Sequence, residues 1–163
     1  MGVVTLSRVD FRLVHGQVAG TWIKQLSARK LIIMCDEVGN DPFMVEMFNL
    51  AAPPGCEIHA YTIEKGVEQW KADQFGDGRL IILFRYVASA KKAYDLGYNM
   101  ESLNIGQVPG GPDRKHASNT VSLSKVELEM LQEMESKGVD VFFQPVPYEK
   151  VVKLETVSKR MKF

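Results

Sequence analysis

Short apolar runs alternate with amphipathic segments along this chain, and the alternation constrains its fold more than any other feature. The runs have the length and the β-branched composition of buried strands. After a first run through Val3, Val4 and Leu6, they are Lys30–Cys35, Cys56–Thr62, Arg79–Phe84, Ser102–Gly106 and Val139–Gln144. Continuous apolar strands that are joined by helices are typical of a parallel sheet covered on both faces. The sequence therefore predicts an α/β fold with a mostly parallel open sheet and helices on both faces.

Boundary signals place helices between these runs. Ser124 and Glu127 form a capping-box pattern, and Gly97 and Gly138 stand where a helix commonly ends in a glycine. The segments expected to be helical are one with Val18, Trp22, Ile23 and Leu26 on one face, one from about 41 to 51 with Met44, Met47, Phe48 and Ala51 inward, one around Val67 and Trp70, one from about 87 to 96, and one from 124 to 138.

Two segments depart from the alternation. The segment Gly106–Thr120 is rich in glycine, proline and polar residues, so it is either a functional loop or a small hairpin. We expect it to line the site described below. The tail Tyr148–Phe163 places apolar residues at helical spacing and is rich in lysine. It is either a helix packed on the body of the protein or a basic docking element.

Length, charge and cysteine content limit the class of protein. A chain of 163 residues argues for one domain, spanning 1–163. Basic and acidic residues both number 20, so the zero net charge gives no general attraction to nucleic acid. No apolar run reaches the roughly 18–20 residues of a membrane-spanning helix, and the N-terminus has no signal-peptide pattern. Cys35 and Cys56 fit neither a disulfide scaffold nor a zinc site, which favours a reducing, cytoplasmic setting.

Several common site motifs are missing. No glycine-rich phosphate-binding loop follows a strand, so the sequence does not indicate a nucleotide cofactor. No hydrolase-type serine motif or metal-ligand spacing is present, so we expect no metal and no other cofactor. His59 lies in an expected strand and His116 in the long loop, and both are interpreted as structural or incidental.

The expected carboxyl ends of the strands gather polar residues at one edge of the sheet. Ligands of open parallel sheets bind at that edge. His15 follows the first strand, Asp36 and Glu37 follow the second, and Arg85 follows the fourth. A site around His15 would therefore have polar neighbours.

The run from Arg8 to Val18 places His15 on the turn between the first strand and the first helix. A helix start favours phosphate because its backbone N–H groups are unpaired. Arg12 adds a fixed positive charge with several donors, which suits phosphate. Asp10 either pairs with Arg12, or accepts the imidazole N–H and fixes the ring tautomer. An ordinary Asp–Arg pair without a chemical role is the alternative.

Two other kinds of protein are compatible with these residues. One is a receiver-like module that is phosphorylated on an aspartate, because Asp36 and Glu37 stand at a strand end. However, Arg85 rather than a lysine follows the fourth strand, and no further acidic residue stands in the expected place. The other is a non-catalytic binding module in which His15 only contacts a ligand.

The run R-V-D-F-R-L-V-H-G-Q-V, followed by Trp22, resembles the phosphorylation-site signature of a known family. This family is the IIB components of the bacterial sugar phosphotransferase system, in the mannose/fructose/sorbose/N-acetylgalactosamine class. The likeness continues through the segments D-E-V, A-P-P-G, N-I-G and V-S-L, which begin at positions 36, 52, 104 and 121. Phe11 is a departure, because the family often carries a second acidic residue there.

The resemblance implies a function for His15. It would accept a phosphoryl group on Nδ1 from a phosphohistidine of a cytoplasmic IIA partner, and pass it to a sugar that arrives through the membrane components IIC and IID. We expect Arg12, Arg8 and the backbone N–H groups of Gly16 and Gln17 to hold the phosphate oxygens. The family is often dimeric and needs no cofactor. The identity of the sugar and the oligomeric state stay open.

Overall fold

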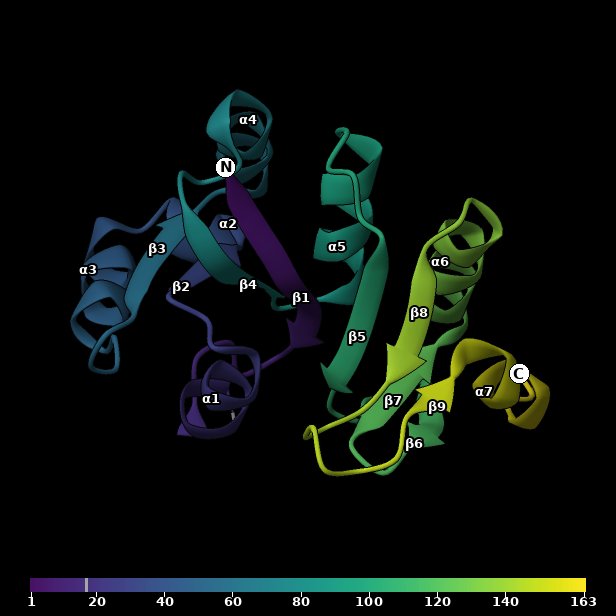
Figure 1. The fold of residues 1–163 in the computed structure, drawn as a ribbon. Helices are drawn as coiled ribbons and strands as arrows, with labels where there is room; N and C mark the ends of the chain where they lie inside the picture. The colour runs from purple at the N-terminus through teal and green to yellow at the C-terminus, as the bar shows by residue number, and fades with distance from the viewer. Residues whose placement is uncertain (17) are drawn as a thin grey trace.

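A seven-stranded sheet organises the fold, with the strand order β3-β2-β4-β1-β5-β8-β9 (Figure 1). The computed structural model describes residues 1–16 and 18–163. The strands of this sheet are β1 (Gly2–Asp10), β2 (Lys30–Met34), β3 (Glu57–Tyr61), β4 (Gly78–Phe84), β5 (Ser102–Gln107), β8 (Asp140–Phe143) and β9 (Val152–Lys153). All neighbouring pairs are parallel except β8 and β9, which are antiparallel. The predicted α/β fold with a mostly parallel sheet is confirmed.

Helices cover both faces of the sheet because its strands are apolar on both sides. Along β4, Leu80 and Ile82 belong to one buried cluster, whereas Ile81 and Leu83 belong to the other, as the alternation of strand side chains requires. The first cluster packs under α4 (Ile63–Asp73), α5 (Val87–Asp95), α6 (Lys125–Ser136) and α7 (Leu154–Arg160); the second packs under η1 (Val18–Trp22), α2 (Asp36–Gly39) and α3 (Pro42–Leu50). Among the described helices, none combines the length and the hydropathy of a membrane span.

Two helices differ in detail from their expected form. The first begins as the π-helical turn η1 and continues as the short helix α1 (Ile23–Leu26), with Val18 and Trp22 buried as expected. In α3, Met44 and Phe48 pack against the core, but Met47 is 50% exposed. The expected inward positions of Met47 and of Ala51, which is also exposed, are therefore wrong, because the face of α3 that meets β3 is centred on Met44, Val45 and Phe48.

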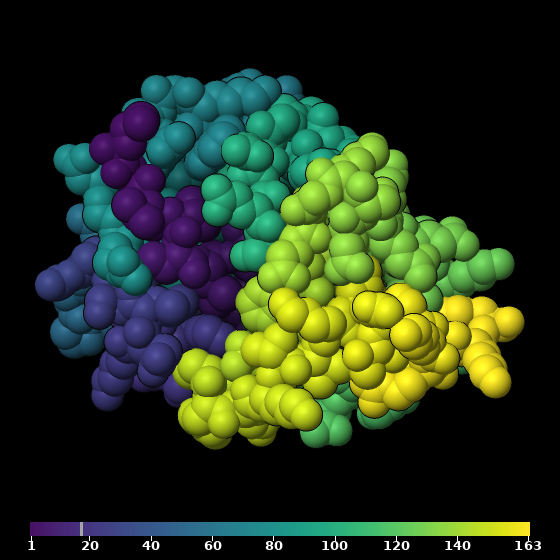
Figure 2. All heavy atoms as spheres, turned by 45° about the vertical axis from the view of Figure 1, so that its right-hand side comes forward, coloured from purple at the N-terminus to yellow at the C-terminus, as the bar shows by residue number. Residues whose placement is uncertain are grey.

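The two unusual segments both have regular structure. The segment Gly106–Thr120 contributes β6 (Arg114–Ser118), which pairs antiparallel with β7 (Val121–Ser124), so its interpretation as a hairpin is confirmed. The C-terminal tail forms β9 and α7, and Leu154 and Val157 of α7 are buried. In Figure 2 the C-terminal residues, in yellow, form one continuous surface with α6, in yellow-green. The tail is thus packed on the body of the protein.

The central strand β1 has a different environment at each of its two ends. It pairs with β4 from Gly2 to Val9, but with β5 from Arg8 to Asp10 alone. β1 and β5 therefore diverge toward their amino ends, on the side of the sheet where Figure 1 marks the N-terminus. At the carboxyl end, β1 has a neighbour on both sides, and the chain leaves it there toward His15.

Candidate functional site

A tight turn carries the chain from β1 into the first helix. The backbone N–H of Leu13 donates to the carbonyl oxygen of Asp10 at 2.9 Å, and Leu13 has a φ of 58°. The left-handed conformation is costly for a leucine, but its side chain is fully buried beneath the sheet. The carbonyl of His15 accepts from Ala19 N at 2.8 Å, so the helix starts at His15. The turn thereby brings Arg12 and His15 to the carboxyl edge of the sheet.

The carboxylate of Asp10 is the centre of the site. One oxygen, Oδ2, lies 2.8 Å from His15 Nε2 and accepts from Arg8 Nη2 at 3.0 Å. The other, Oδ1, accepts from the backbone N–H of Arg12 at 3.0 Å and from its Nε at 3.2 Å. The sequence left open whether Asp10 pairs with Arg12 or holds the imidazole. In the structure, one carboxylate does both.

Three positive or donor groups determine the ionisation of Asp10. Burial raises its pKa, but the hydrogen bonds from His15 and Arg12 and the charge of Arg8 act the other way and together lower the pKa to about 2. Asp10 is therefore an acceptor at neutral pH.

The ionised state of Asp10 determines which nitrogen of His15 carries the proton in the neutral ring. A carboxylate can only accept, so Nε2 must donate to it. In the neutral imidazole the lone pair is then on Nδ1. The side chain of His15 is 16% exposed and that of Arg12 is 34% exposed, whereas Asp10 has no exposure at all. His15 and Arg12 are therefore accessible to solvent, whereas Asp10, which orients both, is not.

Arg8 does not occupy the position that the sequence suggests. Its side chain is 0% exposed, so its guanidinium cannot reach an incoming phosphoryl group, and the expectation that Arg8 binds phosphate is wrong for this structure. It donates instead to Asp10, to Asn104 Oδ1 at 2.6 Å, and to the carbonyl oxygens of Gln144 and Pro145, both at 3.0 Å. Burial lowers the pKa of Arg8, and the neighbouring Asp10 raises it. Arg8 therefore holds the Asp10 carboxylate in place from the buried side of the site.

Sequence reasoning missed the residues that hold Arg8. The guanidinium lies 5.4 Å from the ring centre of Trp22, and Trp22 Nε1 donates to the carbonyl of Pro145 at 3.1 Å. A side chain at Gly106 would collide with the same guanidinium, so only glycine fits there. Asn104 and Gly106 lie within β5, and Pro145 follows β8, so the strand-end rule pointed to the region but not to these partners.

The other strand-end residues form separate contacts beside the turn. Arg85 Nη1 donates to Glu37 at 2.9 Å, the hydroxyl of Tyr86 donates to the same carboxylate at 2.8 Å, and the ring of Phe11 lies 5.9 Å from the guanidinium carbon of Arg85. Asp36 accepts from the backbone N–H of Ile63 at the start of α4 and from Lys92 Nζ. The two carboxylates therefore point to different partners, which argues against a receiver-like acidic pocket.

The remaining candidates lie as follows. Gly16 is exposed at the helix start, and Gln17 lies outside the described residues. Gln107, the second residue of the long segment, pairs with Asp10, so this segment begins at the site. His59 bonds Glu57 at 3.0 Å on the surface of β3. Within the described chain, no group of three His, Cys, Asp or Glu side chains is arranged to hold a metal ion.

The fold and the turn together define an α/β protein in which a buried carboxylate orients a histidine at the carboxyl end of the first strand. The chain matches the family model described as the PTS system sorbose subfamily IIB component over residues 4–163. It belongs to this family, the sugar-specific IIB components of the phosphotransferase system, whose general role is that of a sugar phosphotransferase.

Individual relatives agree with this assignment. The sorbose-specific EIIB component of Klebsiella pneumoniae is 32% identical over 136 residues, which is 83% of each chain. The mannose-specific EIIAB component of Escherichia coli (strain K12) is 25% identical over 96% of this chain, and this chain spans about half (49%) of that protein. The crystal structure of manxB from Thermoanaerobacter tengcongensis superposes with a TM-score of 0.89 at 33% identity and covers 98% of this chain and 97% of its own.

Proposed function

We propose that His15 is the residue that carries the phosphoryl group, and that it does so on Nδ1. The observation that carries this proposal is the 2.8 Å contact between His15 Nε2 and the buried carboxylate of Asp10. This contact engages one ring nitrogen and leaves the lone pair of the neutral ring on the other. An imidazole fixed in one tautomer beside a partly exposed arginine suits a nucleophile for phosphorus.

The first step takes the phosphoryl group from a phosphohistidine on a IIA protein. His15 Nδ1 attacks phosphorus in line, the new N–P bond forms, and the N–P bond of the donor histidine breaks. Arg12 and the backbone N–H groups of Gly16 and Gln17 hold the phosphoryl oxygens, as transfer by positioning and charge stabilisation requires. Asp10 stabilises the positive charge that the His15 ring acquires.

The second step passes the group to a sugar hydroxyl. The hydroxyl oxygen bonds phosphorus, and the N–P bond to His15 breaks with its electron pair returning to Nδ1. The hydroxyl proton passes to that nitrogen or to water. Because the group must depart again, the site should hold it loosely. Arg12 is suited to this: its side chain is one-third exposed, and Asp10 already takes part of its charge.

The partners of this chain follow from the same proposal. The whole chain, 1–163, acts as one IIB unit in the cytoplasm, bound to the membrane through IIC and IID components. The relative named as a mannose-specific EIIAB component joins an A and a B part in its name, which supports a IIA protein as the donor. Dimer formation, common in this family, is a further expectation, and light scattering tests it.

Phosphorylation by a phosphorylated IIA protein tests the proposal. The chain has three histidines, so the matched variants are His15→Ala, His59→Ala and His116→Ala. We expect intact-mass spectra to show a gain of one phosphoryl group in the wild type and in the last two variants, and none in His15→Ala. Normal labelling of His15→Ala would refute the assignment.

The chemical stability of the label separates His15 from the two acidic residues at the end of β2. A phosphohistidine is lost in acid and survives base, whereas an acyl phosphate on Asp36 or Glu37 is labile in base. We expect the label to survive base and to be lost in acid. A non-catalytic binding module predicts no label at all while IIA binding persists.

A further inference from the structure

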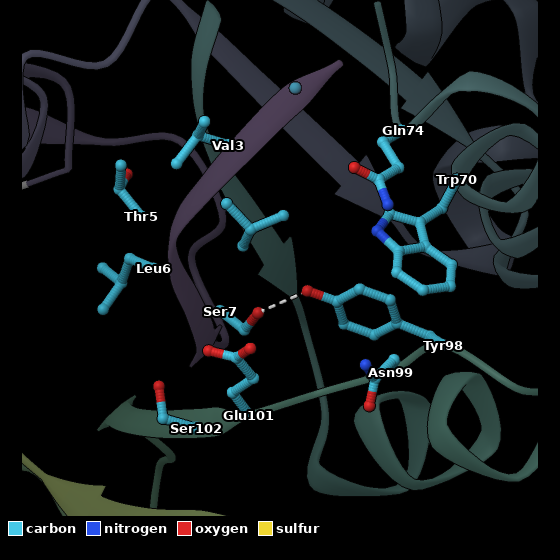
Figure 3. A pocket seen from close by; sticks show the side chains of 12 residues that line it. Val3, Thr5, Leu6, Ser7, Trp70, Gln74, Tyr98, Asn99, Glu101 and Ser102 are labelled. Atoms are coloured by element: carbon cyan, nitrogen blue, oxygen red, sulfur yellow. Dashed lines mark hydrogen bonds between the residues drawn. The ribbon is translucent and has the colours of Figure 1, made fainter.

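A cleft lies between β1 and β5 at the amino ends of the strands, at the opposite edge of the sheet from His15. It has a volume of about 340 Å³, within the range of small-molecule sites. Its walls come from β1, from the end of α4 and from the segment between α5 and β5 (Figure 3). The divergence of β1 from β5 creates it, because the two strands pair only from Arg8 to Asp10 in the described chain.

The cleft lies along the edge of β1 rather than over one of its faces. Six consecutive residues, Gly2 to Ser7, line it. Successive side chains of a strand point to opposite faces. An unbroken run of lining residues therefore places backbone groups as well as side chains at the wall. In Figure 2 these N-terminal residues, in purple, are visible at the surface. A ligand in the cleft would therefore meet backbone donors and acceptors along the β1 edge.

Aromatic and amide groups line the side opposite β1. Trp70 and Tyr98 pack edge to face with their ring centres 5.2 Å apart, and the Tyr98 hydroxyl shares a 2.8 Å hydrogen bond with Ser7 Oγ (Figure 3). Gln74 and Asn99 add amide groups. A flat apolar ring beside amides and hydroxyls suits a ligand with one apolar face and several hydroxyl groups.

One charge distinguishes this cleft from a neutral one. Among the described residues that line it, Glu101 alone is charged, and its carboxylate forms no ion pair in the described part of the chain. Burial raises the pKa of Tyr98 to about 12, and the negative charge of Glu101 adds to the rise, so the field of Glu101 reaches the cleft wall. The cleft therefore favours a cation and disfavours a phosphate.

We propose that this cleft binds a small cationic, polyhydroxylated ligand of the amino-sugar class. The Trp70 ring stacks on the apolar face of the sugar, the amides of Gln74 and Asn99 bond its hydroxyls, and Glu101 pairs with its ammonium group. The proposal rests on these side chains and not on the chemistry of His15.

Titration by two-dimensional NMR tests this site with an internal control. The chain has two tryptophans, and each gives an indole N–H signal. Galactosamine and glucosamine are the probes. We expect a saturable shift of the Trp70 signal, with the Trp22 signal unmoved. No saturable shift at tens of millimolar, or a shift of Trp22 alone, would overturn the proposal.

Matched ligands and variants identify the role of each group. N-acetylgalactosamine lacks the cation, and Glu101→Gln removes the charge that pairs with it. Since Glu101 is exposed, we expect each change to weaken binding only about three- to fivefold. Glu135→Gln, another exposed acidic residue, should leave the affinity unchanged. Equal affinity for the amino sugar and its N-acetyl form would refute the role of Glu101.

His15→Ala separates this inference from the proposed function. We expect His15→Ala to bind galactosamine as the wild type does, even though it takes no phosphoryl group. Galactosamine 6-phosphate should bind more weakly than galactosamine, because the cleft has no basic side chain among its described lining. Tighter binding of the phosphate, or loss of binding in His15→Ala, would contradict the assignment.

Discussion

The two ends of β1 handle charge in opposite ways. At the carboxyl end, Arg8 and Asp10 are wholly buried, and every charged group has a partner at hydrogen-bond distance. At the amino end, Glu101 is exposed and unpaired within the described chain. Buried charges must be neutralised and hydrogen-bonded, so the first end is fixed in one geometry before any partner arrives. At the second end water solvates Glu101, so removing its charge should cost little stability.

The largest expected effect comes from removing the buried arginine. Arg8→Ala leaves the carboxylate of Asp10 buried with one positive partner fewer, and it removes one of the two side-chain donors to each of the carbonyls of Gln144 and Pro145. We expect a loss of about 3–5 kcal/mol of unfolding free energy, measured by denaturant titration. Glu101→Gln, the matched change at the other end, should alter it by less than about 0.5 kcal/mol. Equal effects at the two ends would remove the contrast.

Acid should weaken the carboxyl end selectively. The pKa of Asp10 is lowered from 3.8 to about 2 in the folded protein, so its carboxylate stabilises the fold above pH 4. That contribution, about 2 kcal/mol, is lost as the pH falls from about 4 to 2. We expect the difference in unfolding free energy between wild type and Asp10→Asn to shrink over this window. A difference that stays constant down to pH 2 would mean that Asp10 titrates normally.

Arg12 should affect the reaction more than the fold. It is partly exposed, and its side chain makes a charge-assisted contact, so Arg12→Ala should slow transfer from phosphorylated IIA about 10- to 100-fold. Its unfolding free energy should fall by no more than about 1 kcal/mol. Rapid-quench kinetics and denaturant titration on the same variant measure both. A large stability loss with unchanged transfer would exchange the roles of Arg8 and Arg12.

At the amino end, Tyr98 should affect the stability modestly and the reaction not at all. Tyr98→Phe removes the hydroxyl that bonds Ser7 and leaves the ring in place. We expect a loss of about 1 kcal/mol of unfolding free energy, and no change in phosphorylation of His15. A reduced phosphorylation rate in this variant would show that the two ends of β1 are coupled.

Local patterns in the sequence were sufficient to predict the helices and strands and the position of the turn that carries His15. Apolar runs such as Arg79–Phe84 indicate burial on both faces. The capping box at Ser124 is present as expected, with Glu127 Oε1 accepting from the backbone N–H of Ser124 at 2.9 Å. The positions of His15, Asp10 and Arg12 next to one another follow from their short separation in the chain. Such features depend on neighbours in sequence, so the sequence alone reveals them.

The role of Arg8 could not be found in this way. Its partner Asn104 lies on β5, and its partners Gln144 and Pro145 follow β8. Their approach depends on the order β1-β5-β8 and on its register. An arginine close to a predicted phosphate site is equally consistent with a ligand contact and with a buried support. The cleft between β1 and β5 was missed for the same reason, because only the register shows where the two strands separate.

The position of phosphorus on the His15 ring tests the central claim most directly. After transfer from phosphorylated IIA, ¹⁵N and ³¹P NMR of the labelled protein distinguishes the two ring nitrogens. Because Asp10 engages Nε2, we expect the phosphoryl group on Nδ1 of His15, with the Nε2 proton still hydrogen-bonded. A phosphoryl group on Nε2, or on any other residue, would contradict the account.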